Sequence, residues 1–231
     1  MAGDVLVEGR PITKAGAQVA EDAELRLRGG EQPYVSRGGQ KLFGALQTFD
    51  LNPTGLVCLD AGASTGGFTD CLLQHGAARV YAIDVGTNQL HWKLRSDQRV
   101  VSIEKCNLRN WSPTNIPEKC ALLVADLSFI SLKIALPPLM PSLESNADAI
   151  FLVKPQFEAG KDDVKKGGLV KDPAVHERVC RDIWDFFSDS ELKPMQIAES
   201  PILGGSGNRE FLMHLQLGGQ ARPFPGMPFR R

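Results

Sequence analysis

The segment LVCLDAGASTGGFTD, residues 56–70, constrains the fold of this chain more than any other. An apolar stretch typical of a strand ends in Asp60, a glycine-rich turn follows, and a helical pattern begins at Gly67. A second strand-like stretch, residues 79–83, also ends in a carboxylate, Asp84. Glycines let a ligand approach the backbone, a helix start offers free N–H groups, and the second acid can accept hydrogen bonds from ribose hydroxyls. The spacing therefore predicts a Rossmann-type nucleotide site.

Several ligand classes remain open for such a turn. The dinucleotide fingerprint fits poorly because Ser64 replaces its middle glycine, and a phosphate-binding P-loop fits poorly because Phe68 replaces its lysine. Residues 62–66 match the G-x-S-x-G elbow of serine hydrolases, but that fold needs several strands upstream, where this chain has little strand pattern. The remaining candidate is an S-adenosylmethionine site, and the alternative is a turn that binds no ligand.

Composition excludes some classes of function. The net charge of −1 gives no global positive field, so any RNA contact must come from local patches. Five cysteines without a C-x-x-C pair indicate reduced thiols in a reducing compartment. The chain has no signal peptide, no apolar run of about 18 residues and no metal-ligand spacing of its histidines. We therefore expect a cytoplasmic protein that binds neither a membrane nor a metal.

The chain divides into three predicted parts: a β-rich module at residues 1–29, an α/β domain at 30–218 and a flexible tail at 219–231. Strands and helices alternate through the domain, which predicts a mostly parallel sheet covered on both faces. The short link between the last two strands predicts that this pair is antiparallel. The predicted helices are residues 36–49, 67–74, 88–94, 132–143 and 174–187.

Polar residues follow the predicted strands of this domain, where open α/β sheets bind their ligands. They are Asp60, Asp84, Asn107, Asp126 and Lys154. Lys154 closes a strongly apolar strand, and a buried ammonium there is costly unless a carboxylate is close, so Asp126 on the neighbouring strand is its expected partner. The alternatives are that Asp126 caps a helix and that Lys154 extends to solvent.

Seven ordered segments between residues 33 and 217 resemble the TlyA family, whose members are ribosomal RNA 2′-O-methyltransferases related to the FtsJ type and are sometimes labelled hemolysins. The segments are YVSRGGQKL, LDAGASTGGFTDCLL, QLHWKLR, ADLSFISL, LVKPQFEAG, GGLVKDPAVHE and SPILGGSGNREFL. The resemblance implies a class I, Rossmann-like methyltransferase fold that uses S-adenosylmethionine. It also implies an N-terminal RNA-binding module like ribosomal protein S-four, of which residues 4–27 match only the second, β-rich half.

The resemblance also implies the site residues. A catalytic tetrad falls on Lys41, Asp126, Lys154 and Glu210. Taken alone, Lys41 is a solvated helix charge and Glu210 an edge-strand acid, so only the resemblance assigns them to the site. The implied cofactor residues are Asp60, Gly62, Ala63, Ser64, Gly66, Gly67, Asp84, Asn107 and Asp126.

The implied substrate is a ribose 2′-hydroxyl of ribosomal RNA, on a cytidine, presented as free RNA or in a ribosomal subunit. We hypothesise that Lys154 orients the hydroxyl and, when neutral, accepts its proton. Asp126 and Glu210 would hold the ammonium form, and Lys41 would favour developing negative charge on the oxygen. Two other classes stay open: a membrane-lytic, hemolysin-like protein and a serine hydrolase that uses Ser64.

Overall fold

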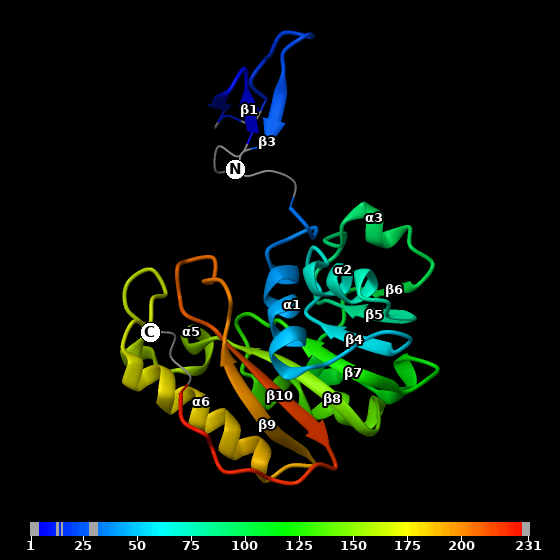
Figure 1. The fold of residues 1–231 in the computed structure, drawn as a ribbon, viewed down its shortest axis with the longest axis vertical. Coiled ribbons are helices and arrows are strands. Elements are labelled where there is room, and N and C mark those ends of the chain that lie inside the picture. The colour runs from blue at the N-terminus through cyan, green and yellow to red at the C-terminus, as the bar shows by residue number, and fades with distance from the viewer. Residues whose placement is uncertain (1–4, 13, 15, 28–31, 228–231) are drawn as a thin grey trace. The chain divides into compact units, whose positions relative to one another are not determined.

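The computed structural model describes residues 5–12, 14, 16–27 and 32–227, and the chain separates into two compact units, Met1–Pro33 and Tyr34–Arg231 (Figure 1). The first unit contains strands β1 (Val5–Val7), β2 (Arg10–Ile12) and β3 (Leu25–Leu27). They form an antiparallel sheet in the order β2-β1-β3. The short β segments predicted for this part of the chain are therefore present.

The second unit is built on a seven-stranded sheet in the order β6-β5-β4-β7-β8-β10-β9. Its strands are β4 (Val57–Ala61), β5 (Arg79–Ile83), β6 (Val100–Ile103), β7 (Cys120–Ala125), β8 (Leu143–Val153), β9 (Leu192–Glu199) and β10 (Phe211–Leu217). Strand β10 runs antiparallel to both of its neighbours, whereas the pairs from β6 to β8 are parallel. The predicted mostly parallel sheet with an antiparallel last strand is confirmed.

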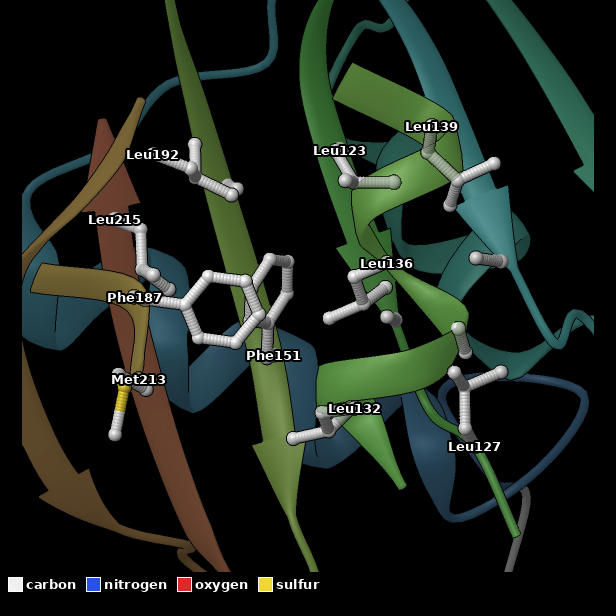
Figure 2. Close-up of a cluster of buried hydrophobic side chains, with 14 of the residues drawn as sticks. Leu123, Leu127, Leu132, Leu136, Leu139, Phe151, Phe187, Leu192, Met213 and Leu215 are labelled. Carbon is white, nitrogen blue, oxygen red and sulfur yellow. The ribbon is translucent and has the colours of Figure 1, made fainter. Parts of the chain in front are cut away.

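Helices cover both faces of this sheet, as Figure 1 shows. They are α1 (Gly38–Phe49), α2 (Gly67–Gln74), α3 (Trp92–Arg95), α4 (Leu132–Ala135), α5 (Pro155–Glu158) and α6 (Pro173–Ser188). Helices α1 and α2 bury Leu42 and Cys71 against alternate strand residues such as Cys58. On the other face, α4 and α6 bury Leu132 and Phe187 (Figure 2). Strands buried on both faces explain the nearly continuous apolar runs in the sequence.

Two predicted helices are shorter than expected. The helix predicted for residues 132–143 is α4 followed by a 3₁₀ segment, Pro137–Ser142, and β8 then begins at Leu143. Prolines 137, 138 and 141 have no N–H to donate, so an α-helix cannot continue through them. The helix predicted for residues 88–94 is reduced to α3, because Asn88 has a left-handed φ of 56° and His91, with a ψ of 139°, is the N-cap at which α3 begins.

The described part of the C-terminal segment, residues 219–227, forms neither helix nor strand. It is nevertheless anchored to α6, because the indole N–H of Trp184 donates to the Arg222 carbonyl at 2.9 Å. The ring of Phe224 packs edge-on against Trp184, with centroids 5.6 Å apart. These contacts hold the segment against Trp184 of α6.

Candidate active site

A turn that depends on glycine follows β4 and forms the floor of the site. Gly62 has a φ of 82°, and its N–H donates to the Ile83 carbonyl at 2.8 Å. A Cβ on Gly62 would lie 2.8 Å from the backbone oxygen of Asp126. Gly66 has a φ of 97°, and a Cβ there would lie 2.2 Å from Leu94. Other residues are strained at these angles and would clash, so the glycines let the ends of β4, β5 and β7 approach each other.

Asp84 is held at the end of β5 by two backbone donors. Its carboxylate accepts the N–H of Ser64 at 2.8 Å and the N–H of Gly86 at 2.7 Å. The side chain is half-buried and lines the cavity described below. Because each carboxylate oxygen has two lone pairs, Asp84 can still accept hydrogen bonds from a bound hydroxyl group.

A cavity of about 570 Å³ opens at the carboxyl ends of β4, β5 and β7. A second cavity of about 240 Å³ adjoins it, since both are lined by Gly62, Ser64, Asp126 and Ser128. Volumes of several hundred Å³ are typical of small-molecule sites. The predicted cofactor residues on the walls are Gly62, Ala63, Ser64, Gly67, Asp84, Asn107 and Asp126.

Two predicted cofactor residues lie behind these walls instead. Asp60 is completely buried beneath the turn, where it accepts the Thr69 hydroxyl at 2.6 Å. Burial raises the pKa of Asp60 to about 7, against the opposing effect of the Thr69 hydrogen bond. Gly66 is buried against Leu94. Asn107 reaches the cavity, but its side-chain oxygen accepts the N–H of Arg109 and caps the next 3₁₀ turn.

The predicted pair of Lys154 and Asp126 is present at the smaller cavity. Lys154 Nζ lies 2.6 Å from Asp126 Oδ1 and donates to Ser128 Oγ at 3.0 Å. It also lies 5.7 Å from the ring centroid of Phe157, in a cation–π contact. All three polar residues line the cavity wall, so the ion pair can contact a bound molecule.

Lys41 and Glu210 form a second ion pair, buried behind the first. Lys41 Nζ on α1 lies 2.5 Å from Glu210 Oε2, immediately before β10. Gln156, two residues after Lys154, donates to Glu210 Oε1 at 3.4 Å. Because Phe211 pairs with Val153 in antiparallel register, Glu210 lies across from Lys154 at the adjacent strand end. The structure thus brings the four predicted residues together as two neighbouring ion pairs.

The loop around Glu210 contains residues that sequence reasoning missed. Asn208 is buried, accepts the N–H of Val170 at 2.9 Å and donates to the Gly168 carbonyl at 2.8 Å. A Cβ on Gly204 would lie 2.3 Å from Glu210 Oε1, so this glycine makes room for the carboxylate. The run GGSGN before Glu210 was the available signal, because glycines and asparagine mark a tight loop.

Phe129 is a second residue that the sequence did not single out. Its side chain is 89 % exposed, it lines the larger cavity, and its φ is 63°. Its ring packs against Phe157 with centroids 4.8 Å apart. A left-handed conformation is unfavourable for an aromatic residue, and such strain concentrates at functional sites. The cavity therefore has an aromatic surface at its mouth.

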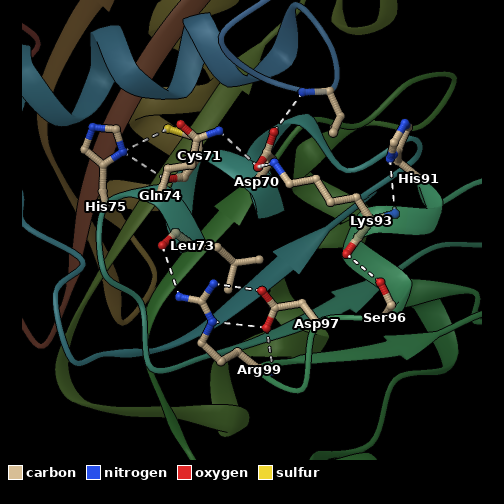
Figure 3. A network of polar contacts seen from close by, with 11 residues as sticks. Asp70, Cys71, Leu73, Gln74, His75, His91, Lys93, Ser96, Asp97 and Arg99 are labelled. Carbon is tan, nitrogen blue, oxygen red and sulfur yellow. Dashed lines mark hydrogen bonds and ion pairs between the residues drawn. The ribbon is translucent and has the colours of Figure 1, made fainter.

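A polar network joins the segment before α1 to α2 and α3 (Figure 3). Asp70, buried on α2, accepts the Val35 N–H at 2.8 Å and the Gln74 side chain at 3.1 Å. Lys93 Nζ lies 4.0 Å from the same carboxylate. The network fixes the start of α1, and hence Lys41, relative to the helix that begins at the glycine turn.

The described residues, 5–12, 14, 16–27 and 32–227, do not offer a metal site. They contain no group of three His, Cys, Asp or Glu side chains that could hold a metal ion. None of their helices is long and apolar enough to cross a membrane. The described walls of both cavities carry no histidine, the usual base for a nucleophilic serine.

Comparisons with known proteins agree with this geometry. The family described as FtsJ-like methyltransferase matches residues 34–217. The 16S/23S rRNA (cytidine-2′-O)-methyltransferase TlyA of Mycobacterium tuberculosis is 44% identical over 93% of this chain and 81% of its own length. Hemolysin A of Brachyspira hyodysenteriae is 40% identical over 93% of this chain and 89% of its own length.

Solved structures resemble the same part of the chain. A protein of Streptococcus thermophilus that carries the hemolysin name has a TM-score of 0.83 at 43% identity, over 96% of this chain and 81% of its own. An S-adenosylmethionine-dependent methyltransferase of Mesorhizobium loti has a TM-score of 0.55 at 12% identity, over 76% of this chain and 97% of its own. The second likeness concerns the fold alone.

Proposed function

Because the chain belongs to the FtsJ-like methyltransferase family, we propose that it transfers a methyl group from S-adenosylmethionine to the 2′-hydroxyl of a cytidine in ribosomal RNA. The observation that carries the proposal is the Lys154–Asp126 ion pair on the wall of a cavity formed by the glycine turn and Asp84. The name of the Mycobacterium tuberculosis relative supports the choice of cytidine. This substrate implies a cytoplasmic enzyme.

The cavity residues fit S-adenosylmethionine. Asp84 is fixed at a strand end, and its carboxylate can accept further hydrogen bonds from ribose hydroxyls. Gly62 and Ser64 of the glycine turn lie on the cavity wall. Asn107 lies on the same wall, where the adenine is expected. Asp60 supports the turn from below through Thr69. When bound, S-adenosylmethionine supplies an electrophilic methyl group on a sulfonium.

The chain's own residues handle the proton of the acceptor. A ribose hydroxyl is almost fully protonated near neutral pH, so transfer requires its orientation and the removal of its proton. Lys154, in its neutral form, accepts that proton, and Asp126 at 2.6 Å stabilises the resulting ammonium. Ser128 Oγ at 3.0 Å fixes the position of the amine.

The buried pair positions this machinery. Lys41 joins α1 to Glu210, and Gln156 joins Glu210 to the segment that follows Lys154. The formal charges of the two lysines and two carboxylates balance, as a partly buried cluster requires. Phe129, at the cavity mouth, offers a surface on which the acceptor base can stack.

The test is methyl transfer from tritiated S-adenosylmethionine to isolated small and large ribosomal subunits that lack the modification. Wild-type protein is expected to label RNA, and Asp84→Ala is expected to lose cofactor affinity and labelling together. Absence of label from both subunits and from free ribosomal RNA would refute the proposal. Dye release from phospholipid vesicles without methyl transfer would favour the membrane-lytic alternative instead.

A further inference from the structure

We propose that the outward side of α3, formed by Trp92, Lys93 and Arg95, binds a single-stranded segment of the substrate RNA beside the methyl-transfer cavity. This inference rests on the proposed function, because it concerns how the same substrate is held. It adds a second RNA contact, on the helix that packs against Gly66 of the glycine turn. The occupant is an unpaired base together with its flanking phosphates.

The inward side of α3 is anchored to the cofactor turn. A Cβ on Gly66 would lie 2.2 Å from Leu94 and 2.7 Å from Leu90, and both leucines are buried. The His91 N–H donates to the Thr65 carbonyl at 3.1 Å. Figure 1 shows α3 next to α2, which begins at this turn. RNA bound to α3 would therefore be held at a fixed distance from the cavity.

Trp92 is left on the outer side by this packing. Its side chain is 74 % exposed, whereas the other two tryptophans, Trp111 and Trp184, are 7 % and 1 % exposed. Its ring lies next to that of His91, with 5.9 Å between the ring centroids. A large aromatic face open to solvent is suited to stacking on an unpaired base, an interaction that tolerates any base.

The side chains beside Trp92 are positively charged and exposed. The Lys93 side chain is 61% exposed, and its nearest carboxylate, Asp70, lies 4.0 Å away and already accepts two hydrogen bonds. Arg95 is exposed and gives one donor to Asn88 Oδ1, which leaves the rest of its guanidinium open. Asp97, the next acid along the chain, is paired with Arg99.

This combination fits RNA better than it fits a protein partner. A single aromatic side chain between two cations lacks the contiguous apolar area of a protein interface. Alternating stacking surface and positive charge is instead the usual composition of single-strand binding sites. Gln89, three residues before Trp92, lines the larger cavity, so a strand leaving the cavity can reach Trp92.

The experiment measures co-sedimentation of the full chain with isolated ribosomal subunits, separately from methyl transfer. The variants are Trp92→Ala and Lys93→Gln/Arg95→Gln. The matched controls are Phe186→Ala, an exposed aromatic on α6, and Lys119→Gln, an exposed charge before β7. Thermal unfolding and S-adenosylmethionine titration are recorded for each variant.

Trp92→Ala is expected to weaken subunit binding about tenfold, equivalent to about 1.4 kcal/mol, and to raise KM for RNA with little change in kcat. The double variant is expected to lower the slope of log affinity against log salt by about 2. Wild-type affinity in both variants would overturn the proposal, even if methyl transfer is observed. Absence of methyl transfer by the wild type would refute the proposed function, while the binding comparison would still decide the role of α3.

Discussion

Two lysine–carboxylate pairs lie at adjacent strand ends of one sheet, and they differ in what surrounds them. In the Lys154–Asp126 pair, at 2.6 Å, the carboxylate side chain is 23% exposed and both residues line a cavity. In the Lys41–Glu210 pair, at 2.5 Å, the carboxylate is 3% exposed, and neither residue is on the described walls of the two cavities. The same residue types therefore have different access to a bound molecule.

Access to the cavity determines which of the two ion pairs can react with a substrate and which can only influence it indirectly. A pair on the cavity wall can exchange a proton with a substrate, whereas a pair behind the wall acts through its charge and by holding the elements that carry it. Under the proposed function, Lys154 and Asp126 act on the hydroxyl, and Lys41 and Glu210 hold α1 against the end of β10. Variants of the two pairs should then fail in different measurements.

The largest effect is expected for Lys154→Met, which keeps the apolar stem and removes the amine. Its kcat should fall by about 10²–10⁴-fold, the range for a general acid–base group, with little change in cofactor affinity. Its unfolding free energy should fall less than that of Lys41→Met, because the Asp126 side chain is 23% exposed whereas the Glu210 side chain is 3% exposed. Lys119→Met, at an exposed site before β7, is the control for loss of a lysine. Near-wild-type turnover in Lys154→Met would show that Lys154 is not the group that accepts the proton.

Lys41→Met should instead act mainly on stability. It leaves the buried Glu210 carboxylate without its ion pair, which costs about 3–5 kcal/mol in comparable cases. The double variant Lys41→Met/Glu210→Leu should recover much of this loss, because it removes both charges. Urea unfolding of the four proteins gives the coupling energy. Additive losses in the double variant would show that the two side chains are not coupled.

The raised pKa of Asp60, beneath the glycine turn, should make the unfolding free energy depend on pH. Its folded-state pKa of about 7 lies above the usual value near 3.8. The folded state therefore retains a proton that the unfolded state loses, and stability falls as pH rises from about 4 to about 7, by at most about 4 kcal/mol. Asp60→Asn should flatten this dependence in urea titrations at several pH values. Parallel curves for the variant and the wild type would rule out this origin.

A smaller effect is expected for Asn208→Ala, which removes the side-chain hydrogen bonds that hold the loop before Glu210. Loss of its buried hydrogen bonds to Val170 and Gly168 should cost about 1–3 kcal/mol. Hydrogen exchange should increase most at the Val170 amide. Gln196→Ala, an exposed amide on β9, is the control. Unchanged protection at Val170 would mean that Asn208 does not hold the loop.

The same contrast explains how much the sequence could predict. The turn at residues 62–67 depends on a backbone conformation that only glycine adopts easily, so the local sequence is enough to predict it. The Lys154–Asp126 pair follows from two adjacent strand ends. Lys41 and Glu210 are separated by 169 residues, and no local pattern joins a helix lysine to an acid that precedes an inner strand of the sheet. For that pair, only the family resemblance supplied the assignment.

The remaining differences have physical causes that local patterns do not express. The helix predicted for residues 132–143 is mostly lost because several prolines cannot donate to it. Asp60 was expected to end its strand, but β4 continues to Ala61, and the Asp60 side chain points beneath the turn, toward Thr69, and so misses the cavity wall. Which way a side chain points depends on packing from both faces of the sheet, and this is set by the whole fold.

The most direct test of the account identifies the nucleoside that receives the methyl group. Subunits treated with the protein and deuterium-labelled S-adenosylmethionine are digested, and the nucleosides are analysed by mass spectrometry. We expect label on the ribose of cytidine as the 2′-O-methyl form, and its loss with Lys154→Met. Label on a base, or label retained at full yield in Lys154→Met, would contradict it.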